Sequence, residues 1–151
     1  MESVSSVSLK HLLDPRLIGT GDTLDDWQLL GSSCQDCGRK FQPPRALCPG
    51  CGRATEHALL AQTGTVVVST LVAQPAVGLL IECPYQIGLI QLDEGGPVIE
   101  AVAVRPLAPS GALPPGTRVE LVLSELEVPL DGERVLFYRY RPIEAGSGGI
   151  Q

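Results

Sequence analysis

Four of the five cysteines in this 151-residue chain form two Cys-x-x-Cys pairs. The pairs are Cys34 with Cys37 and Cys48 with Cys51; ten residues separate them, and a glycine follows each pair directly. Four thiolates at this spacing can close a tetrahedron around one metal ion, and each glycine permits the positive φ that turns backbone N–H groups toward sulfur. Because such a cage leaves no position for water or substrate, the pattern predicts one structural ion, with zinc favoured.

Two disulfides, an iron ion or a thioredoxin-like redox motif could use the same cysteines. Disulfides fit poorly, because paired spacing is typical of metal knuckles and the first residues lack the basic and apolar parts of a secretory signal. The redox motif is a single Cys-x-x-Cys beside a β-α-β pattern, whereas two pairs occur here in a Gly- and Pro-rich stretch. Iron would make the chain an electron carrier, and the sequence separates iron from zinc poorly.

Outside the cysteine pairs, few groups could catalyse a reaction. His11 and His57 have no obvious Ser, Cys or carboxylate partner, and Cys83 stands in an apolar stretch where a packing role is expected. Asp93-Glu94 precedes two glycines and therefore predicts a hairpin turn. Neither a P-loop nor a dinucleotide-binding glycine motif occurs. We therefore expect a protein that is not itself an enzyme.

The elements that position the cysteines begin with residues 1–30, which carry the signals of an N-terminal helical segment. Ser8 could cap a first short helix over Leu9 to Leu13. Asp22 or Thr23 could cap a second one that runs through Leu24, Trp27 and Leu30. Residues 31–62 are predicted to form a zinc ribbon. In so short a module the metal replaces the apolar core that the chain cannot supply.

The remaining sequence predicts a β-barrel. Runs of β-branched residues separated by Gly and Pro give five strands, over residues 65–73, 86–92, 98–105, 117–123 and 134–140. Five short strands after a small leading module favour a Greek-key barrel of the OB type over residues 63–143, with a five-stranded sandwich as the alternative. Residues 144–151 form a Gly-rich tail. The fold class is therefore mainly β.

Composition narrows the kinds of partner. The formal net charge is −6, and no apolar run approaches the roughly 18 residues that span a bilayer, so we expect a cytoplasmic protein without a membrane segment. Zinc ribbons and OB barrels both occur in single-stranded nucleic-acid-binding proteins, which keeps that function as an alternative. The acidic balance and the scarcity of aromatic residues, 4% of the chain, argue against nucleic acid as a partner.

Several motifs together resemble the family known as DUF thirty-five, over about residues 24–142. The resemblance is carried by the two cysteine knuckles, by Phe41-Gln42-Pro43-Pro44-Arg45 between them, by Gly64-Thr65-Val66, and by Pro84-Tyr85 ahead of Ile87 to Gly95. Gln42 is a departure, because the family usually runs from Phe directly into the proline pair. The resemblance implies a rubredoxin-like zinc ribbon joined to an OB-fold.

Members of that family typically accompany thiolase-fold enzymes that act on acyl-coenzyme A (acyl-CoA). These enzymes include acetyl transferases, assemblies of thiolase with hydroxymethylglutaryl-CoA synthase, and aldolases that shorten steroid side chains. The resemblance therefore implies a hetero-oligomer in lipid metabolism, in which this chain is the non-catalytic subunit. It would bind a thiolase-like subunit, an aldolase or an acyltransferase, with acyl-CoA at the shared interface.

Two sets of residues are candidates for those contacts. Apolar residues without evident room in a small core predict a partner interface made of Leu12, Leu13, Trp27, Val77, Leu79, Leu80 and Ile81. Basic residues could meet the phosphates of CoA, and these are Arg45, Arg139 and Arg141. The two in the last strand would share one face. Solvated edge charges for that pair, and a local carbonyl cap or salt bridge for Arg45, are the alternatives.

Overall fold

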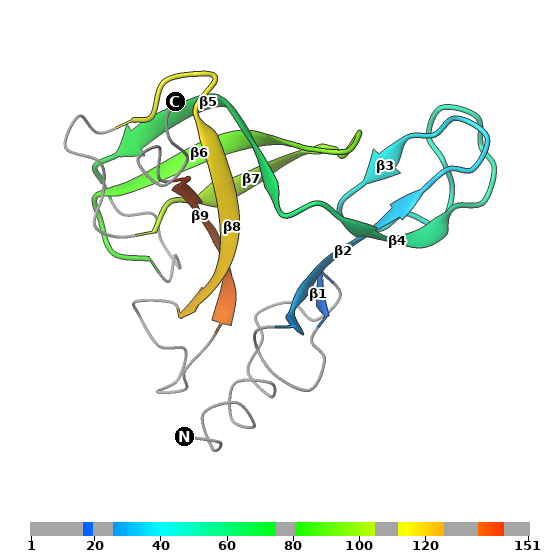
Figure 1. The fold of residues 1–151 in the computed structure, drawn as a ribbon, viewed down its shortest axis with the longest axis horizontal. Helices are drawn as coiled ribbons and strands as arrows, with labels where there is room; N and C mark the ends of the chain where they lie inside the picture. The colour runs from blue at the N-terminus through cyan, green and yellow to red at the C-terminus, as the bar shows by residue number, and fades with distance from the viewer. Residues whose placement is uncertain (1–16, 20–25, 75–80, 105–111, 126–135, 144–151) are drawn as a thin grey trace, which may run out of the picture.

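The computed structural model describes residues 17–19, 26–74, 81–104, 112–125 and 136–143. These residues form nine β-strands in two sheets, and none of them lies in an α-helix. Figure 1 shows the two sheets side by side along the long axis of the molecule, with the barrel at the left and the ribbon at the right. Within the described residues, no helical segment has the length and apolarity needed to span a membrane.

The ribbon sheet is organised around one central strand. The strands are β1 (Ile18–Gly19), β2 (Gln28–Ser33), β3 (Lys40–Phe41) and β4 (Glu56–Leu60). Strand β2 pairs antiparallel with each of the other three, and its longest pairing, with β4, covers five residue pairs from Leu29↔Leu60 to Ser33↔Glu56. This sheet therefore fixes the chain on both sides of the cysteines.

The predicted second helix is wrong where the structure describes it, because Leu30 lies in β2. Trp27 and Leu29, two positions apart, are both buried, which is the spacing of a strand and not of a helix. The backbone N–H of Leu30 donates to the carbonyl oxygen of Leu17 at 2.8 Å. Long-range pairing thus overrides the local helix signals; residues 1–16 and 20–25 lie outside the described part.

The second sheet is a nearly closed five-stranded barrel. Its strands are β5 (Thr63–Val72), β6 (Tyr85–Leu92), β7 (Val98–Val102), β8 (Arg118–Glu125) and β9 (Leu136–Pro142). They run in the order β7-β6-β5-β8-β9, every neighbouring pair is antiparallel, and a parallel bridge between Ala103 and Tyr140 brings the two ends together. This near closure shortens the free edges that an open sheet would expose, and it confirms the barrel.

Alternation along the strands fills the barrel. Val119 and Leu121 are buried and Leu123 packs against them, as the sequence pattern predicted for one face of β8. The same apolar cluster continues into the ribbon, where it includes Ile18, Trp27, Leu29 and Leu60. The ribbon and the barrel therefore share one core, and the division of the chain at residue 62 stays a prediction.

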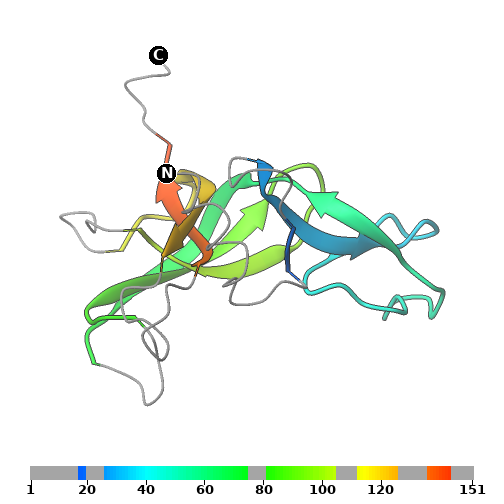
Figure 2. The same ribbon diagram turned by 90° about the horizontal axis from the view of Figure 1, so that it is seen from below.

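Polar contacts also join the two parts. The backbone N–H of Leu29 donates to Oε1 of Gln62 at 2.8 Å, next to the short link between β4 and β5. The ammonium of Lys40, on β3, donates to the carbonyl oxygen of Glu94 in the β6–β7 turn at 2.9 Å. In Figure 1, and in the view from below in Figure 2, the loops on either side of β3 reach away from the barrel. Those loops carry the cysteines.

Candidate metal centre

Each cysteine pair sits on a tight turn that a glycine completes. Gly38 and Gly52 have φ of 75° and 79°, in the left-handed region that favours glycine. The N–H of Gly38 donates to the carbonyl oxygen of Cys34 at 2.8 Å, and that of Gly52 donates to the carbonyl oxygen of Cys48 at 2.7 Å. The two turns are therefore matched knuckles, and the positive φ predicted from the sequence is confirmed.

Backbone N–H groups point at the first sulfur of each knuckle. The N–H of Cys37 donates to Sγ of Cys34, and the N–H of Gly50 donates to Sγ of Cys48, both at 3.3 Å. Such bonds favour the charged thiolate over the neutral thiol, because the donor dipole is oriented toward sulfur. The knuckle backbone thus prepares the sulfurs to act as metal ligands.

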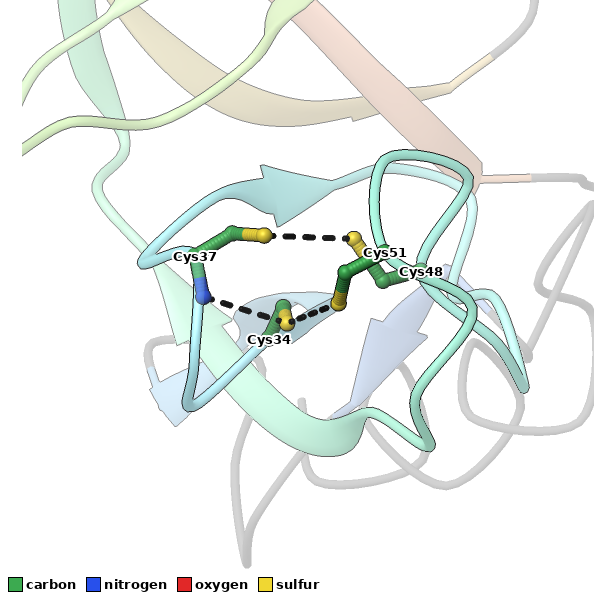
Figure 3. Close-up of side chains that lie close together, drawn as sticks. All are labelled: Cys34, Cys37, Cys48 and Cys51. Atoms are coloured by element: carbon green, nitrogen blue, oxygen red, sulfur yellow. Dashed lines mark hydrogen bonds between the residues drawn. The ribbon is translucent and has the colours of Figure 1, made fainter.

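The two knuckles bring their sulfurs into one cluster. The four Sγ atoms lie within 4.8 Å of one another, with 3.6 Å between Cys34 and Cys51 and 4.0 Å between Cys37 and Cys48 (Figure 3). A Zn–S bond of about 2.3 Å gives a tetrahedral edge of about 3.8 Å. The cluster therefore has the size of a four-thiolate metal site, and its cysteines are free thiols and not disulfides.

The four cysteines differ in exposure, and the pKa values of Cys37 and Cys48 are shifted in opposite directions. Cys34 and Cys48 are buried, each with 1% of its surface exposed, whereas Cys37 and Cys51 are exposed. Hydrogen bonds with the thiols of Cys51 and then Cys34 raise the pKa of Cys37 to about 12. Burial raises the pKa of Cys48, but backbone hydrogen bonds from Cys51 and Gly50 outweigh it and lower that pKa to about 7. A metal ion would therefore displace protons as it binds.

Arg45 lies between the knuckles with its side chain exposed, and its backbone groups are fixed by hydrogen bonds. Its N–H donates to Oγ of Ser32 at 2.9 Å, its carbonyl oxygen accepts from the hydroxyl of Thr55, and its guanidinium lies 5.9 Å from the centre of the Phe41 ring. A pocket of about 240 Å³ lies here, lined by Arg45, Ser32, Pro44, Ala46, Thr55 and the exposed His57. A cationic side chain at a pocket can bind an anionic group.

The other two candidate arginines are placed differently. Arg139 is only 4% exposed, so its burial contradicts the prediction that it meets the phosphates of CoA. Arg141, two positions on, is exposed and its Nε donates to Oε2 of Glu120 on β8 at 2.8 Å. Three consecutive residues of β9, Tyr138, Arg139 and Tyr140, are buried. Burial on both faces of this part of the strand depends on tertiary packing, which residue spacing does not reveal.

The predicted partner interface falls mostly outside the described residues, where Leu12, Leu13, Val77, Leu79 and Leu80 lie. Ile81 is half-buried. Trp27 is 9% exposed and belongs to the shared core, so its assignment to a partner surface is corrected to a packing role. The apolar cluster that contains Trp27 includes residues of both the ribbon and the barrel, which the sequence of each module by itself did not predict.

An exposed apolar strip on the barrel was missed from the sequence. Val68 and Leu89 pair across β5 and β6 with 49% and 39% of their surfaces exposed, and Val98 on β7 is 47% exposed. The first two help to line a hollow of about 120 Å³. The sequence of β6 does contain a signal for this strip. Ile87 and Leu89 lie on one face and the buried Ile90 and Leu92 on the other, so both faces of the strand are apolar.

The carboxylate of Asp93 has a structural partner. It accepts from both terminal nitrogens of Arg118, at 2.9 and 2.6 Å, and from the hydroxyl of Thr63 at 2.6 Å. The N–H of Gly96 donates to the carbonyl oxygen of Asp93 at 3.1 Å, which closes the predicted hairpin turn between β6 and β7. Hydrogen bonding to Arg118 and then to Thr63 lowers the pKa of Asp93 to about 2. Asp93 therefore anchors the turn.

Comparison with known proteins adds three similarities. Residues 24–62 match the family model described as ChsH2, rubredoxin-like zinc ribbon domain. Two proteins named DUF35 domain-containing scaffold protein are similar over most of their lengths. The one from Pyrococcus furiosus is 33% identical, over 79% of this chain and 86% of the relative. The one from Methanocaldococcus jannaschii is 29% identical, over 91% and 99%.

A solved structure is also similar. It is titled Ltp2-ChsH2(DUF35) aldolase, and the matching chain is 28% identical to this one with a TM-score of 0.57. The match covers 76% of this chain and 84% of that chain, so it extends well beyond the ribbon.

Proposed function

Because this chain belongs to the family of DUF35 domain-containing scaffold proteins, we propose that it is a non-catalytic accessory subunit of an enzyme complex. Its partner in this proposal is a thiolase-like enzyme that acts on acyl-CoA, either an aldolase or an acyltransferase. The likeness of most of the chain to relatives named as scaffold proteins carries the proposal. The likeness to a chain of a solved aldolase supports an enzyme as the partner.

The metal centre has a structural role in this proposal. Cys34, Cys37, Cys48 and Cys51 would hold one zinc ion, and the match of residues 24–62 to a zinc ribbon supports zinc over iron. A zinc ion with four thiolate ligands ties two loops together and offers no open position for substrate. The chain then contributes shape, and the partner contributes the reaction. A reducing compartment such as the cytoplasm would keep the thiols available to the metal.

The exposed strip of Val68, Leu89 and Val98 supports a role in protein binding. Val68 and Leu89 lie opposite each other, and Val98 is a diagonal neighbour of Leu89 on β7, opposite Gln91. Large apolar side chains that are 39–49% exposed on neighbouring strands are typical of an interaction surface. We propose that the thiolase-like partner binds this strip, because Trp27, the predicted interface residue, is buried in the core. Ile81, which is half-buried just ahead of β6, stays a candidate contact.

Arg45 is the remaining candidate for acyl-CoA at a shared interface. Arg45 lines a pocket, whereas Arg139 is buried and Arg141 is paired with Glu120. Arg118, on the barrel, likewise forms a salt bridge, with Asp93. These engagements weigh against the alternative of a single-stranded nucleic-acid-binding module, which needs a basic groove along the barrel.

A tagged full-length chain, purified from its native host, tests the accessory role. We expect a protein with a thiolase-type fold to co-purify in fixed stoichiometry and to be identified by mass spectrometry. The isolated chain should show no turnover of CoA thioesters. Co-purification of nucleic acid instead of such a subunit, or turnover by the chain alone, would contradict the proposal.

A matched pair of variants tests the surface. Leu89→Asp should weaken association with the identified partner at least tenfold, because it places a charge in the apolar contact. Leu59→Asp should not, because Leu59, although more exposed than Leu89 at 60%, lies on β4 of the ribbon. Equal affinities of both variants and the unmodified chain would remove this strip from the interface.

A further inference from the structure

The two cysteine knuckles are related by a sequence repeat that extends beyond their cysteines. Each reads Cys-x-x-Cys-Gly-Arg, so that Arg39 follows the first knuckle and Arg53 follows the second. The carbonyl oxygen of Arg39 accepts from the N–H of Cys34, and that of Arg53 accepts from the N–H of Cys48, both at 2.8 Å. Each arginine therefore closes its own knuckle through its backbone, which leaves its side chain free to reach elsewhere.

The two side chains cross over to the opposite knuckle. The guanidinium of Arg39 packs over Gly50, the third residue of the second knuckle: a Cβ atom built on Gly50 would stand 3.0 Å from Nη1 of Arg39 and 3.6 Å from Sγ of Cys48. In the matching place, Nε of Arg53 lies 3.3 Å from Oδ2 of Asp36, the third residue of the first knuckle. The knuckles are thus linked by two reciprocal contacts besides the sulfur cage.

The two contacts differ in charge. Four thiolates around a divalent ion carry a net charge of about minus two, which a nearby cation offsets. The guanidinium of Arg53 is already paired with the carboxylate of Asp36, whereas Arg39 faces a glycine beside the sulfur of Cys48. Arg39 therefore brings a positive charge to the cage that no carboxylate at the matching position balances.

We propose that Arg39 is a positioning residue that stabilises the metal-loaded cage through its charge, and that it needs the absence of a side chain at Gly50 to do so. This inference rests on the metal centre of the proposed function. The φ of Gly50 lies outside the left-handed region, so alanine is compatible with the backbone there. A methyl group at Gly50 would then act only by moving the guanidinium away.

The test is the rate at which a chelator removes zinc from the loaded full-length chain. Arg39→Gln should accelerate release by about 1.5-fold to 5-fold at low salt, the range that corresponds to a solvent-exposed charge interaction. The acceleration should shrink near 1 M salt, where the screening length is about 3 Å. Arg39→Lys should restore part of the slow release, because it keeps the charge. Arg141→Gln, an exposed arginine of the barrel, is the matched control and should release zinc like the unmodified chain.

The Gly50→Ala variant makes the test specific. It should accelerate release in the same direction, and the double variant Arg39→Gln with Gly50→Ala should be no faster than Arg39→Gln alone. Additive effects of the two substitutions, or an Arg39→Gln rate equal to that of the Arg141→Gln control, would overturn the inference. The spectrum of the cobalt-substituted protein reports whether the four-sulfur cage forms in each variant.

Two further outcomes are decisive. If Arg39→Gln forms no cage while Arg39→Lys does, the charge is required and the inference stands. If neither variant forms one, the shape of the side chain and not its charge is what matters, and the inference fails. A chain that binds no metal in any form would instead remove the metal centre of the proposed function.

Discussion

The sulfur atoms of Cys34 and Cys51 lie 3.6 Å apart, although 17 positions separate the two residues in the chain. Cys34 directly follows β2, and Cys51 lies in the loop before β4. These strands pair along their lengths, ending with Ser33 opposite Glu56, so the sheet register brings the two knuckles together. The cage is therefore a product of the ribbon sheet as well as of the cysteine spacing.

Loss of one buried ligand should empty the cage. We expect Cys48→Ser to reduce the metal content of the purified chain from one ion to near zero, because three thiolates no longer enclose the ion. Structural zinc can supply on the order of 10 kcal/mol of apparent folding free energy, so the variant should also unfold at much lower temperature. Cys83→Ser is the control: Cys83 lies outside the cage, and that variant should keep its metal. Equal metal contents in the two variants would exclude the four-cysteine site.

The single tryptophan offers a reporter of the shared core. Trp27 is 9% exposed and directly precedes β2, the strand that leads into Cys34. Chelation of the metal should loosen this strand and shift the fluorescence emission of Trp27 to the red as water reaches its ring. If the emission stays unchanged while the metal leaves, the core is independent of the metal centre.

The pairing of Asp93 with Arg118 predicts a dependence of stability on pH. The pKa of Asp93 is lowered from 3.8 to about 2, so its stabilising contribution is fully present above about pH 4 and is lost as the pH falls through 2. Because the two side chains are 32% and 49% exposed, we expect only about 0.5–1 kcal/mol. Urea unfolding should show Asp93→Asn less stable by this amount at pH 7. A difference that persists undiminished at pH 2 would contradict the ion pair as its cause.

A buried hydrogen bond helps to close the barrel. The hydroxyl of Tyr140 on β9 donates to Oε1 of Gln86 on β6 at 2.9 Å, and both side chains are fully buried. Tyr140→Phe should lower the free energy of unfolding by about 1–3 kcal/mol, because it takes a donor from a buried amide oxygen. Tyr138→Phe should cost less, since the hydroxyl of Tyr138 reaches the carbonyl oxygen of Glu100 only at 3.3 Å. Chemical denaturation measures the free energy of unfolding of both variants. A larger loss for Tyr138→Phe than for Tyr140→Phe would contradict the stabilising role of the Tyr140 hydrogen bond.

The sequence was most informative where local chemistry dictates the structure. The cysteine spacing with its glycines predicted the two knuckles, and the glycines after Asp93-Glu94 predicted the turn between β6 and β7. The barrel strands were predicted because β-branched runs and Pro-Gly breaks follow the rules of short strands. Strand β6, for example, spans Tyr85–Leu92, within one residue of the predicted range.

Features that depend on distant partners could not be predicted in the same way. Leu29 and Leu30 lie in the predicted helical segment and became part of β2 because β4, some 30 positions later, pairs with them. Arg139 and Arg141 have the same residue type and lie two positions apart on one strand, yet one is buried and the other is exposed and paired with Glu120. Trp27 was predicted to contact a partner. It lies instead in a core that forms only when the ribbon packs against the barrel, and the sequence does not show that packing.

The scaffold role proposed for this chain depends on four cysteines that together enclose one zinc ion. X-ray absorption at the zinc edge, combined with metal analysis of the chain purified from its host, measures this directly. We predict one zinc ion per chain, surrounded by four sulfur atoms at about 2.3 Å. A folded chain that holds no tightly bound metal, or a zinc ion with nitrogen or oxygen among its ligands, would contradict the account.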